Sequence, residues 1–479
     1  MAPRNRKGGG SGVGGKRGGG RQPPNRHAHG SNPTAFWLKA AAAGASVALI
    51  YFLLVARPPH GTVPVKALRE VERLGVKGHD HLLREEFDKA HEFLDQALVI
   101  AETHEFLHRK STLLEPILTH KASTVGNEAI KTGRLEQIPV AVGFYLRAYN
   151  ISKSLRTLVN VATLYSAVGN LTEHMNVSRQ ILDVLLSDPR QAKQLEGPSH
   201  ISRRPEDIEK SKLEATDMMR RVLSDFMISA RRMGDANFAA DYFWKMKALY
   251  PEQIPWTDTY QTTINYVADD NLNDKPWWDA HEFPEFRQLE AKHERIREEL
   301  HRYLAEEGEF QLGEDHTLIG TRESESQIQK DDWSEVLLWN SDGITSEFSP
   351  ICKRFPITCS AIYQIPMVTG TAVHQGGNPV LGQVTFFKLK AGSHLVPHVG
   401  TCNLRLTAHL GLIIPEGVSL RVANETRVWK QGKVIVFDDS FEHEVWHNGI
   451  EDRYVLYMSL WKREFGETVR SKAAQFWKQ

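Results

Sequence analysis

The stretch that decides the fold runs from Val396 to Arg453. It begins with VPHVG at 396–400, continues with LRLTAHLGLIIP at 404–415, and contains FDDSFEHEVW at 437–446 before it reaches the arginine. Short β-rich runs alternate here with residues typical of turns. Regular short strands of this kind predict a sandwich, a jelly roll or a barrel.

The same pattern covers the chain after Asp332. Runs with strand character are 335–339, 383–390, 404–414, 419–423, 427–429, 433–437, 442–447 and 454–461. Turn residues such as Pro, Gly, Asn, Asp and Ser separate them. We therefore assign 331–466 to one β-rich domain and 467–479 to a C-terminal tail.

Alternation along 404–413 sorts the side chains to two faces. One face, which we expect to be core, contains Leu404, Leu406, Ala408, Leu410 and Leu412. Arg405, Thr407 and His409 share the other face, where they contact an anion or a metal, or else face water. Arg453 opens a mostly apolar strand, so it needs a wet edge or an anionic partner such as a bound dicarboxylate.

Two histidines of the stretch, His398 and His443, are separated by several short strands and followed by Arg453. Imidazole suits Fe(II), and two histidines with open positions are typical of non-haem iron oxygenases. A full facial triad has Asp or Glu two residues after the first histidine, where this chain has Gly400. Either water fills that gap or a carboxylate elsewhere reaches it. A three-histidine, cupin-like site that uses His409 and a domain without metal stay open as alternatives.

Apolar residues in the middle of the chain recur at helical spacing. Segments 158–189 and 218–251 share a plan: a helix with small residues, a glycine-containing turn, a second helix and a proline. This plan is similar to degenerate tetratricopeptide units, which stack into a solenoid with a concave binding face. The alternative is an irregular helical domain. We assign 63–272 to this region and 273–330 to a connector, with a charged, solvated helix at 286–307.

The first 30 residues are rich in glycine and contain seven Lys or Arg and no acidic residue. This composition predicts a disordered basic tail at 1–33, without the aromatic residues that RNA-binding tails interleave. Residues 34–57 are apolar over a length that spans a bilayer. The alternative, a cleaved signal peptide, lacks a clean cleavage site. With the basic end cytosolic, we expect the rest of the protein in the lumen of the secretory pathway.

The charge balance and the cysteine content limit which partners and which cellular compartment the sequence predicts. Lys plus Arg and Asp plus Glu both total 59, so bulk charge does not argue for a nucleic-acid partner. Cys352 and Cys359 close a short loop. A lumenal location permits a disulfide between them, whereas the cytosol would keep two reduced thiols.

Together these blocks resemble the aspartyl/asparaginyl β-hydroxylase family. The resemblance rests above all on 437–446, and further on 396–398, 405–412 and the Pro-Trp-Trp at 276–278. It covers roughly 275–461. The order of the preceding parts (basic tail, anchor and repeat-like helices) is also similar to that of the animal enzyme.

The resemblance implies a double-stranded β-helix that binds Fe(II) and 2-oxoglutarate. His398 and His443 would be the iron ligands, and Gly400 matches family members, which lack the carboxylate ligand. Arg453 would form a salt bridge with the far carboxylate of 2-oxoglutarate. His409 would contact the same cosubstrate.

The implied reaction is hydroxylation by O₂ with release of succinate and CO₂. In the animal enzyme the targets are Asp and Asn side chains of EGF-like domains in the endoplasmic reticulum, so we expect a single-pass type II membrane protein with a lumenal catalytic domain. Thr407 and Phe387 depart from the arginine and serine of animal members, and Arg405 would substitute for the lost charge. An anchored scaffold with an inactive barrel, and an oxygenase for a lipid or small molecule, stay open as alternatives.

Overall fold

The computed structural model describes residues 65–103, 111–196, 205–308, 333–341, 346–365 and 383–464. The basic tail predicted at 1–33, the membrane helix predicted at 34–57 and the tail at 467–479 lie outside these residues. Among the described helices, none combines the length and the apolar character that a membrane span needs. The chain from Val63 onwards forms one compact unit.

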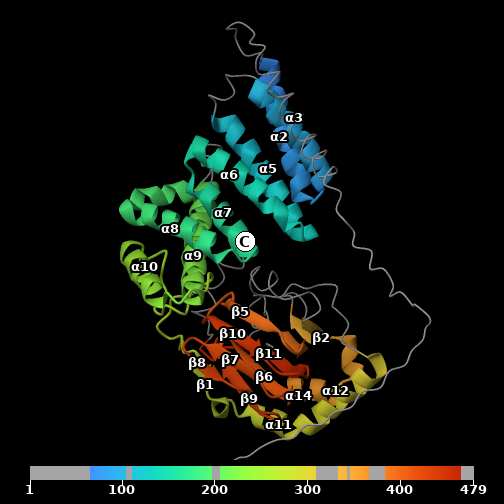
Figure 1. The fold of residues 1–479 in the computed structure, drawn as a ribbon. Helices are drawn as coiled ribbons and strands as arrows, with labels where there is room; N and C mark the ends of the chain where they lie inside the picture. The colour runs from blue at the N-terminus through green and yellow to red at the C-terminus, as the bar shows by residue number, and fades with distance from the viewer. Residues whose placement is uncertain are drawn as a thin grey trace, which may run out of the picture. The chain divides into compact units, whose positions relative to one another are not determined.

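The first part of the described chain is helical (Figure 1). Its helices are α2 (Val65–Leu83), α3 (Phe87–Thr103), α5 (Ser111–Thr132), η1 (Leu135–Gln137), α6 (Ile138–Ser152), α7 (Leu155–Ala167), α8 (Leu171–Ser187), η2 (Pro189–Leu195), α9 (Pro205–Arg232) and α10 (Ala236–Leu249). Neighbours in sequence pack on one another: α2 on α3, α5 on α6, α7 on α8 and α9 on α10. The predicted helical region is confirmed, and its likeness to tetratricopeptide units stays a prediction.

Two of these pairs contain the expected glycine turn. Gly169 joins α7 to α8 and Gly234 joins α9 to α10, with φ angles of +70° and +85°. After the first glycine, the Asn170 N–H donates to the Tyr165 carbonyl five residues earlier, and the same bond recurs at the second turn. Such a helix end needs a left-handed residue, which glycine adopts without steric cost.

The last part of the chain forms two antiparallel sheets. Its strands are β1 (Trp277–Trp278), β2 (Trp333–Ser341), β3 (Ser346–Phe348), β4 (Gln383–Leu389), β5 (His394–His398), β6 (Arg405–Ile413), β7 (Val418–Val422), β8 (Glu425–Arg427), β9 (Val434–Phe437), β10 (His443–His447) and β11 (Arg453–Trp461). The larger sheet has the order β1-β9-β6-β11-β4-β2-β3 and the smaller the order β5-β10-β7-β8. A C-terminal region of antiparallel sheets is confirmed, and the name double-stranded β-helix stays a prediction.

Shorter helices cover the outer face of the larger sheet. They are η3 (Ala280–Glu282), α11 (Glu285–Ala291), α12 (His293–Glu307), η4 (Pro350–Lys353) and α14 (Pro356–Tyr363). Leu406, Ala408 and Leu410 of β6 share one apolar cluster with residues of α11, α12 and α14. The core face predicted for this strand is therefore correct.

The opposite face of β6 is covered as well. A second apolar cluster joins Phe387 and Phe437 of the larger sheet to Leu420 and Val445 of the smaller one, so the two sheets pack face to face. Arg405, Thr407 and His409 lie on this inner face and are all buried. The alternative that these three side chains face water is therefore wrong, because the second sheet and its loops shield them.

The segment expected to be a connector, 273–330, differs from that expectation over its described part. Trp277 and Trp278 pair with β9 as an edge strand of the larger sheet. Helix α12 packs Ile296 and Leu300 against the same sheet. The charged residues of α12 hid this role, because they cover its outer face while apolar residues three and four apart form the inner one.

Two contacts fix the loop before α14. Cys352 and Cys359 form a disulfide with their Cα atoms 5.9 Å apart. Glu299 of α12 is buried, and it accepts the backbone N–H groups of Ile357 and Thr358 at 2.7 and 2.9 Å. A carboxylate at a helix N-terminus satisfies amides that have no partner within the helix.

His174 of α8 is buried in the helical region. Its Nδ1 lies 2.9 Å from Ser229 Oγ on α9, and its Nε2 lies 3.2 Å from Ser178 Oγ. Burial lowers the pKa of His174 from 6.5 to about 4. At pH 5 the histidine is therefore neutral in the folded protein and protonated in the unfolded chain.

Acid should destabilise the protein through this histidine. Above pH 6.5, His174 is unprotonated in both the folded protein and the unfolded chain. Below pH 6.5 the unfolded chain binds a proton at this histidine, whereas the folded protein binds it only near pH 4. The free energy of unfolding should fall over this window, by up to about 1.4 kcal/mol per pH unit. We expect His174→Gln to reduce the slope in urea unfolding between about pH 7 and pH 5. In the control, His281→Gln, the replaced side chain is 87% exposed, and the slope should not change. A wild-type slope in His174→Gln would contradict the prediction.

Candidate active site

His398 and His443 face each other across two paired strands. His398 ends β5, His443 begins β10, and they are direct partners in the antiparallel register. Their ring centroids are 4.1 Å apart. Each Nδ1 bonds the carbonyl two residues earlier, of Val396 at 2.8 Å and of Phe441 at 2.9 Å. Since a carbonyl can accept but not donate, both Nδ1 atoms carry the proton and both Nε2 atoms keep a lone pair.

Both rings are neutral at pH 7. Burial lowers the pKa of His398 to about 3, with a further effect from His443, and burial lowers the pKa of His443 to about 4. Neutral imidazole is the form that binds a metal ion, and the two carbonyl contacts fix the orientation of each ring. The pair therefore offers two pre-oriented nitrogen ligands.

The position of the missing carboxylate is closed to any side chain. A Cβ at Gly400 would lie 2.7 Å from Cγ and Oδ1 of Asp439 and 2.9 Å from the Asp439 backbone oxygen. Asp439 Oδ2 accepts from Thr407 Oγ1 at 3.2 Å, and its Oδ1 has no hydrogen-bond partner among the described residues. A carboxylate from the turn after β9 thus lies beside the gap. Asp439 belongs to the FDDSFEHEVW block, but no sequence pattern distinguishes it from its neighbours as a residue of the site.

The described residues contain no group of three His, Cys, Asp or Glu side chains placed to hold a metal ion. The structure therefore does not bring His409 to the His398–His443 pair as a third ligand. Asp439 does not complete a three-ligand group either. The candidate metal ligands are the two paired histidines.

Arg453 is a buried guanidinium with unused donors. Its side chain is 1% exposed, and within the described part of the chain Nε and Nη1 have no acceptor. Its Cζ lies 4.7 Å from the ring centre of Trp429. Burial lowers the pKa of Arg453 to about 9, so the group is still charged at pH 7. A buried charge without a counter-ion is costly, and a bound carboxylate would offset that cost.

His409 connects the two parts of the site. Trp429 Nε1 donates to His409 Nδ1 at 3.3 Å, so His409 carries its proton on Nε2. Its ring stacks on Trp429 and meets Phe437 edge-on at 5.4 Å, and Phe437 in turn lies 5.5 Å from the His443 ring. Burial and the charge of Arg453 hold the pKa of His409 well below its usual value. His409 is thus a neutral hydrogen-bond donor.

Comparison with known proteins places the chain among hydroxylases. Residues 290–463 match the family model described as Aspartyl/Asparaginyl beta-hydroxylase. The human aspartyl/asparaginyl beta-hydroxylase is 37% identical over 197 residues, which is 40% of this chain and 23% of that protein. The ornithine lipid ester-linked acyl 2-hydroxylase of Rhizobium tropici is 31% identical over 221 residues, which is 45% of this chain and 69% of that protein.

The chain belongs to the aspartyl/asparaginyl β-hydroxylase family. It spans about a quarter of the length of its human and mouse relatives of that name. Among solved structures, a Thermus thermophilus protein matches at 16% identity and a TM-score of 0.15, over 17% of this chain and 72% of that one. This TM-score is too low to support an argument about the fold.

The structure does not bring the two arginines of this β-hydroxylase-family chain together. Arg405 pairs with Trp461 on the β6–β11 ladder, eight residues from Arg453. At ~3.3 Å per residue, that distance is about 26 Å along the strand. Arg405 Nη2 donates to Thr401 Oγ1 at 3.3 Å, and its charge acts on Asp439. Arg405 therefore belongs to the Asp439 end of the interior, as Thr407 does, and its substitution for an arginine at position 407 stays a prediction.

The two departures from the animal β-hydroxylases have clear packing roles. Thr407 bonds the Asp439 carboxylate, as described above. Phe387 of β4 is buried, and its ring centroid lies 4.9 Å from that of Tyr457 on β11. The animal members carry an arginine and a serine at these two positions. This chain instead has the short hydroxyl side chain of Thr407 and the aromatic contact of Phe387 with Tyr457.

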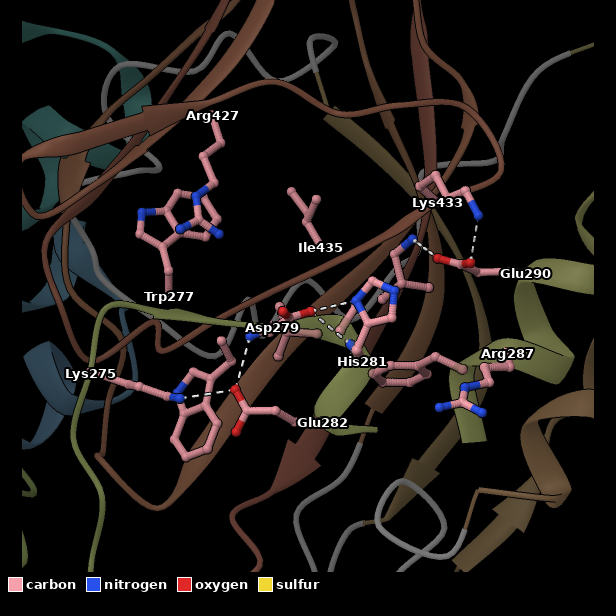
Figure 2. Close-up of a pocket in the computed structure, with 15 residues that line it drawn as sticks. Lys275, Trp277, Asp279, His281, Glu282, Arg287, Glu290, Arg427, Lys433 and Ile435 are labelled. Carbon is pink, nitrogen blue, oxygen red and sulfur yellow. Dashed lines mark hydrogen bonds and ion pairs between the residues drawn. The ribbon is translucent and has the colours of Figure 1, made fainter. Parts of the chain in front are cut away.

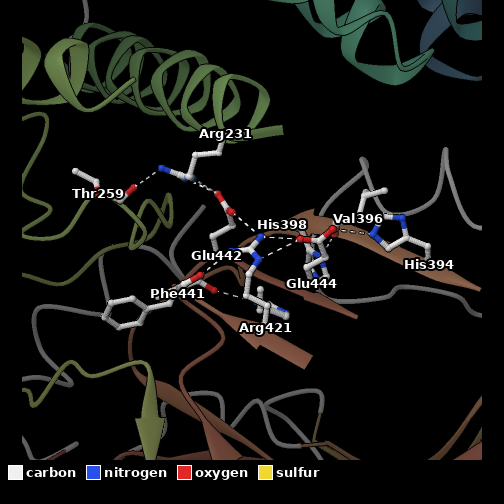
Figure 3. A network of polar contacts seen from close by, with 11 residues as sticks. Arg231, Thr259, His394, Val396, His398, Arg421, Phe441, Glu442 and Glu444 are labelled. Carbon is white, nitrogen blue, oxygen red and sulfur yellow. Dashed lines mark hydrogen bonds and ion pairs between the residues drawn. The ribbon is translucent and has the colours of Figure 1, made fainter. Parts of the chain in front are cut away.

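Polar contacts flank the second histidine (Figure 3). Glu442 lies between Arg231 of α9 and Arg421 of β7, at 2.7 and 2.8 Å. Glu444 bonds Arg421 at 2.8 Å and His394 at 2.7 Å. Alternation along β10 directs these glutamates away from the face that carries His443. They anchor the strand without entering the histidine site.

A pocket beside β1, η3 and β9 contains none of the predicted site residues (Figure 2). Lys275 lies over the Trp278 ring at 4.2 Å, and Arg427 lies over the Trp277 ring at 4.4 Å. Other charged groups of the pocket pair with one another, as Lys433 does with Glu290 at 2.9 Å. We therefore place the candidate active site between the two sheets.

Gly400→Ala should destabilise the protein, because the added Cβ would push against both the side chain and the backbone of Asp439. Overpacking of this kind costs about 1–3 kcal/mol. The matched control is Gly143→Ala in α6, where nothing lies within 4 Å of the new Cβ. That change should stabilise the helix by about 0.5–1 kcal/mol. Urea unfolding of both variants tests the pair, and wild-type stability of Gly400→Ala would contradict the prediction.

Proposed function

We propose that the protein is an Fe(II)- and 2-oxoglutarate-dependent dioxygenase that hydroxylates carbon. The observation that carries the proposal is the pair of neutral, oriented imidazoles of His398 and His443, linked through His409 to the unpaired guanidinium of Arg453. Family membership supports a hydroxylase, and the side chains present fit both implied groups.

The fit to iron rests on the donor set. Two imidazole nitrogens suit Fe(II) and leave several positions open for a cosubstrate and O₂. His398 and His443 would hold the metal, which when bound supplies the chemistry of O₂ activation. Gly400 keeps the third protein position free of a side chain, and the Asp439 carboxylate beside it is placed to accept from a water.

The fit to 2-oxoglutarate rests on buried N–H donors of the site for which the described residues supply no hydrogen-bond acceptor. Arg453 has buried donors without acceptors on Nε and Nη1, and a guanidinium can bind a carboxylate through charge-assisted N–H bonds. The Nε2–H of His409, which lies between Arg453 and the His398–His443 pair, is a further hydrogen-bond donor. Trp429 covers both groups, and so keeps water away from the charge and strengthens the ion pair. Arg405 lies too far along the strand to share this carboxylate with Arg453.

For the substrate, we propose Asp or Asn side chains of lumenal protein domains such as EGF-like domains, hydroxylated at the β-carbon. The name of the human relative supports this class. The Cys352–Cys359 disulfide supports an oxidising compartment. With the apolar run at 34–57 as an anchor, the proposed location is the endoplasmic reticulum membrane, type II, with a lumenal site.

A second candidate is an oxygenase that acts on a lipid. The lipid hydroxylase of Rhizobium tropici matches over two thirds of its own length. Thr407 in place of an arginine also makes the interior less cationic than in the animal members, and Phe387 in place of a serine makes it more apolar. A third candidate, an anchored scaffold with an inactive barrel, is disfavoured by the preserved histidine pair and Arg453.

The deciding experiment measures succinate formation from 2-oxoglutarate by the full-length chain loaded with Fe(II). One arm adds peptides with Asp or Asn in disulfide-constrained loops, and the other adds acylated lipids. Turnover stimulated by peptides and abolished in His443→Ala supports the proposal, and stimulation by lipids alone favours the second candidate. Absence of both 2-oxoglutarate binding and turnover would contradict the oxygenase.

Arg453→Met should weaken 2-oxoglutarate binding roughly ten- to a hundredfold, because a charge-assisted bond contributes about 1.5–3 kcal/mol. The variant should also unfold at the same denaturant concentration as the wild type or a higher one without ligand, because it removes an uncompensated buried charge. Calorimetric titration of the anaerobic Fe(II) protein gives the affinity. Arg427→Met, at a partly exposed arginine outside the site, is the control and should bind normally. An Arg453→Met protein with wild-type affinity would refute the assignment.

A further inference from the structure

Residues 253–267, which we call the bridging segment, run from the end of α10 towards β1. Although they form no regular element, the side chains of Gln261, Thr262 and Thr263 are 0% exposed. Buried polar side chains in a loop need hydrogen-bond partners. In the bridging segment these partners come from two sides.

Helix α9 supplies one side. Arg220 donates from Nε to the Gln253 carbonyl and from Nη1 to the Ile264 carbonyl, both at 2.7 Å. Ser224 Oγ lies 2.8 Å from Thr262 Oγ1. One arginine thus fixes two backbone positions eleven residues apart, so the bridging segment is held against the helical region.

The metal-site strands supply the other side. Thr263 Oγ1 donates to the Gly400 carbonyl at 2.6 Å, two residues after the first histidine. The Tyr260 carbonyl accepts the N–H of Glu442 at 2.7 Å, one residue before the second histidine. Further bonds join Gln261 to Ser440, Asn265 to Thr401 and Val267 to Asn403.

Arg231, at the end of α9, reinforces this arrangement directly (Figure 3). Its Nε donates to Glu442 Oε2 at 2.7 Å, and its Nη1 donates to the Thr259 carbonyl at 3.2 Å. Its Cζ also lies 4.5 Å from the Tyr260 ring centre. The guanidinium therefore contacts the bridging segment and the histidine-bearing strand at once.

The two histidines need such support because strand pairing ends beside them. His398 is the last residue of β5, His443 is the first of β10, and the register shifts between His443 and Val445. Beyond the last residue pair of a β-ladder, only other hydrogen bonds hold the backbone in position. Here those bonds come from Thr263 and Tyr260 of the bridging segment, together with the Ala423 N–H that donates to the Glu442 carbonyl and the Gly400 N–H that donates to the Asp439 carbonyl.

We propose that α9 positions the metal-binding histidines through the bridging segment, with Thr263 and Arg231 as positioning residues. The inference rests on the proposed iron site. It makes the helical region part of the catalytic machinery, in addition to any role as a substrate platform. Outer contacts of this kind typically change metal affinity about 10- to 100-fold when they are removed.

The test uses Co(II) binding to the full-length chain, since the visible absorption of bound Co(II) reports its ligand geometry. Thr263→Val keeps the side-chain shape but removes the hydroxyl that donates to Gly400. We expect the Co(II) dissociation constant to rise about tenfold or more and the absorption bands to shift. Arg231→Met should act in the same direction, and Arg231→Lys should restore part of the affinity because it keeps the charge beside Glu442.

The control is Thr124→Val in α5. Thr124 is equally buried, and its hydroxyl also donates to a backbone carbonyl, that of His120 at 2.8 Å. The control should keep the wild-type Co(II) affinity and spectrum even where its thermal stability drops as much as that of Thr263→Val. If Thr263→Val and Arg231→Met both bind Co(II) as the wild type does, the positioning role is overturned and the proposed function stands. A wild-type chain that does not bind Co(II) overturns the proposed function itself.

Discussion

His398 and His443 are direct partners in the antiparallel pairing of β5 with β10, and the candidate site depends on this register. Side chains of opposite residues in such a pair lie on the same face, with Cβ atoms about 4.5–5.5 Å apart. That spacing is what allows two imidazoles to converge on one ion. A slip by one residue would turn one of the rings to the other face of the sheet. The polar contacts of Glu442 on the opposite face therefore protect the site by holding β10 in place.

The interior between the sheets contains a buried charge that destabilises the folded protein unless a ligand compensates it. Arg453 is charged and buried, the Trp429 ring against its Cζ carries no charge, and His409 is neutral. A core selected for stability alone would not keep a guanidinium there. Binding of an anion to the folded state would recover this cost, and it would raise the stability of the protein by mass action. The fold thus holds Arg453 ready for a carboxylate.

The sequence predicted what depends on local pattern. Alternation placed Leu406 and Ala408 on the outer core and His409 on the inner face, and the motif blocks pointed to His398 and His443. It could not show that Arg405 and Arg453 lie at opposite ends of the interior, because that depends on the register of β6 against β11. It also missed Asp439, since its place beside Gly400 comes from a turn that only the folded chain brings there.

The link between the two regions was hidden for the same reason. Arg231 and Glu442 are 211 residues apart in the chain, and neither stands out in a helix or strand pattern. An apolar contact would stabilise such a junction as well, but it tolerates sliding. A buried carboxylate held by Arg231 on one side and Arg421 on the other has one favourable position, because any displacement leaves a charge unpaired. We therefore infer that the Arg231–Glu442 ion pair holds β10, which carries His443, at a defined distance from α9. On this view the sheets supply the ligands and the helical region supplies their alignment.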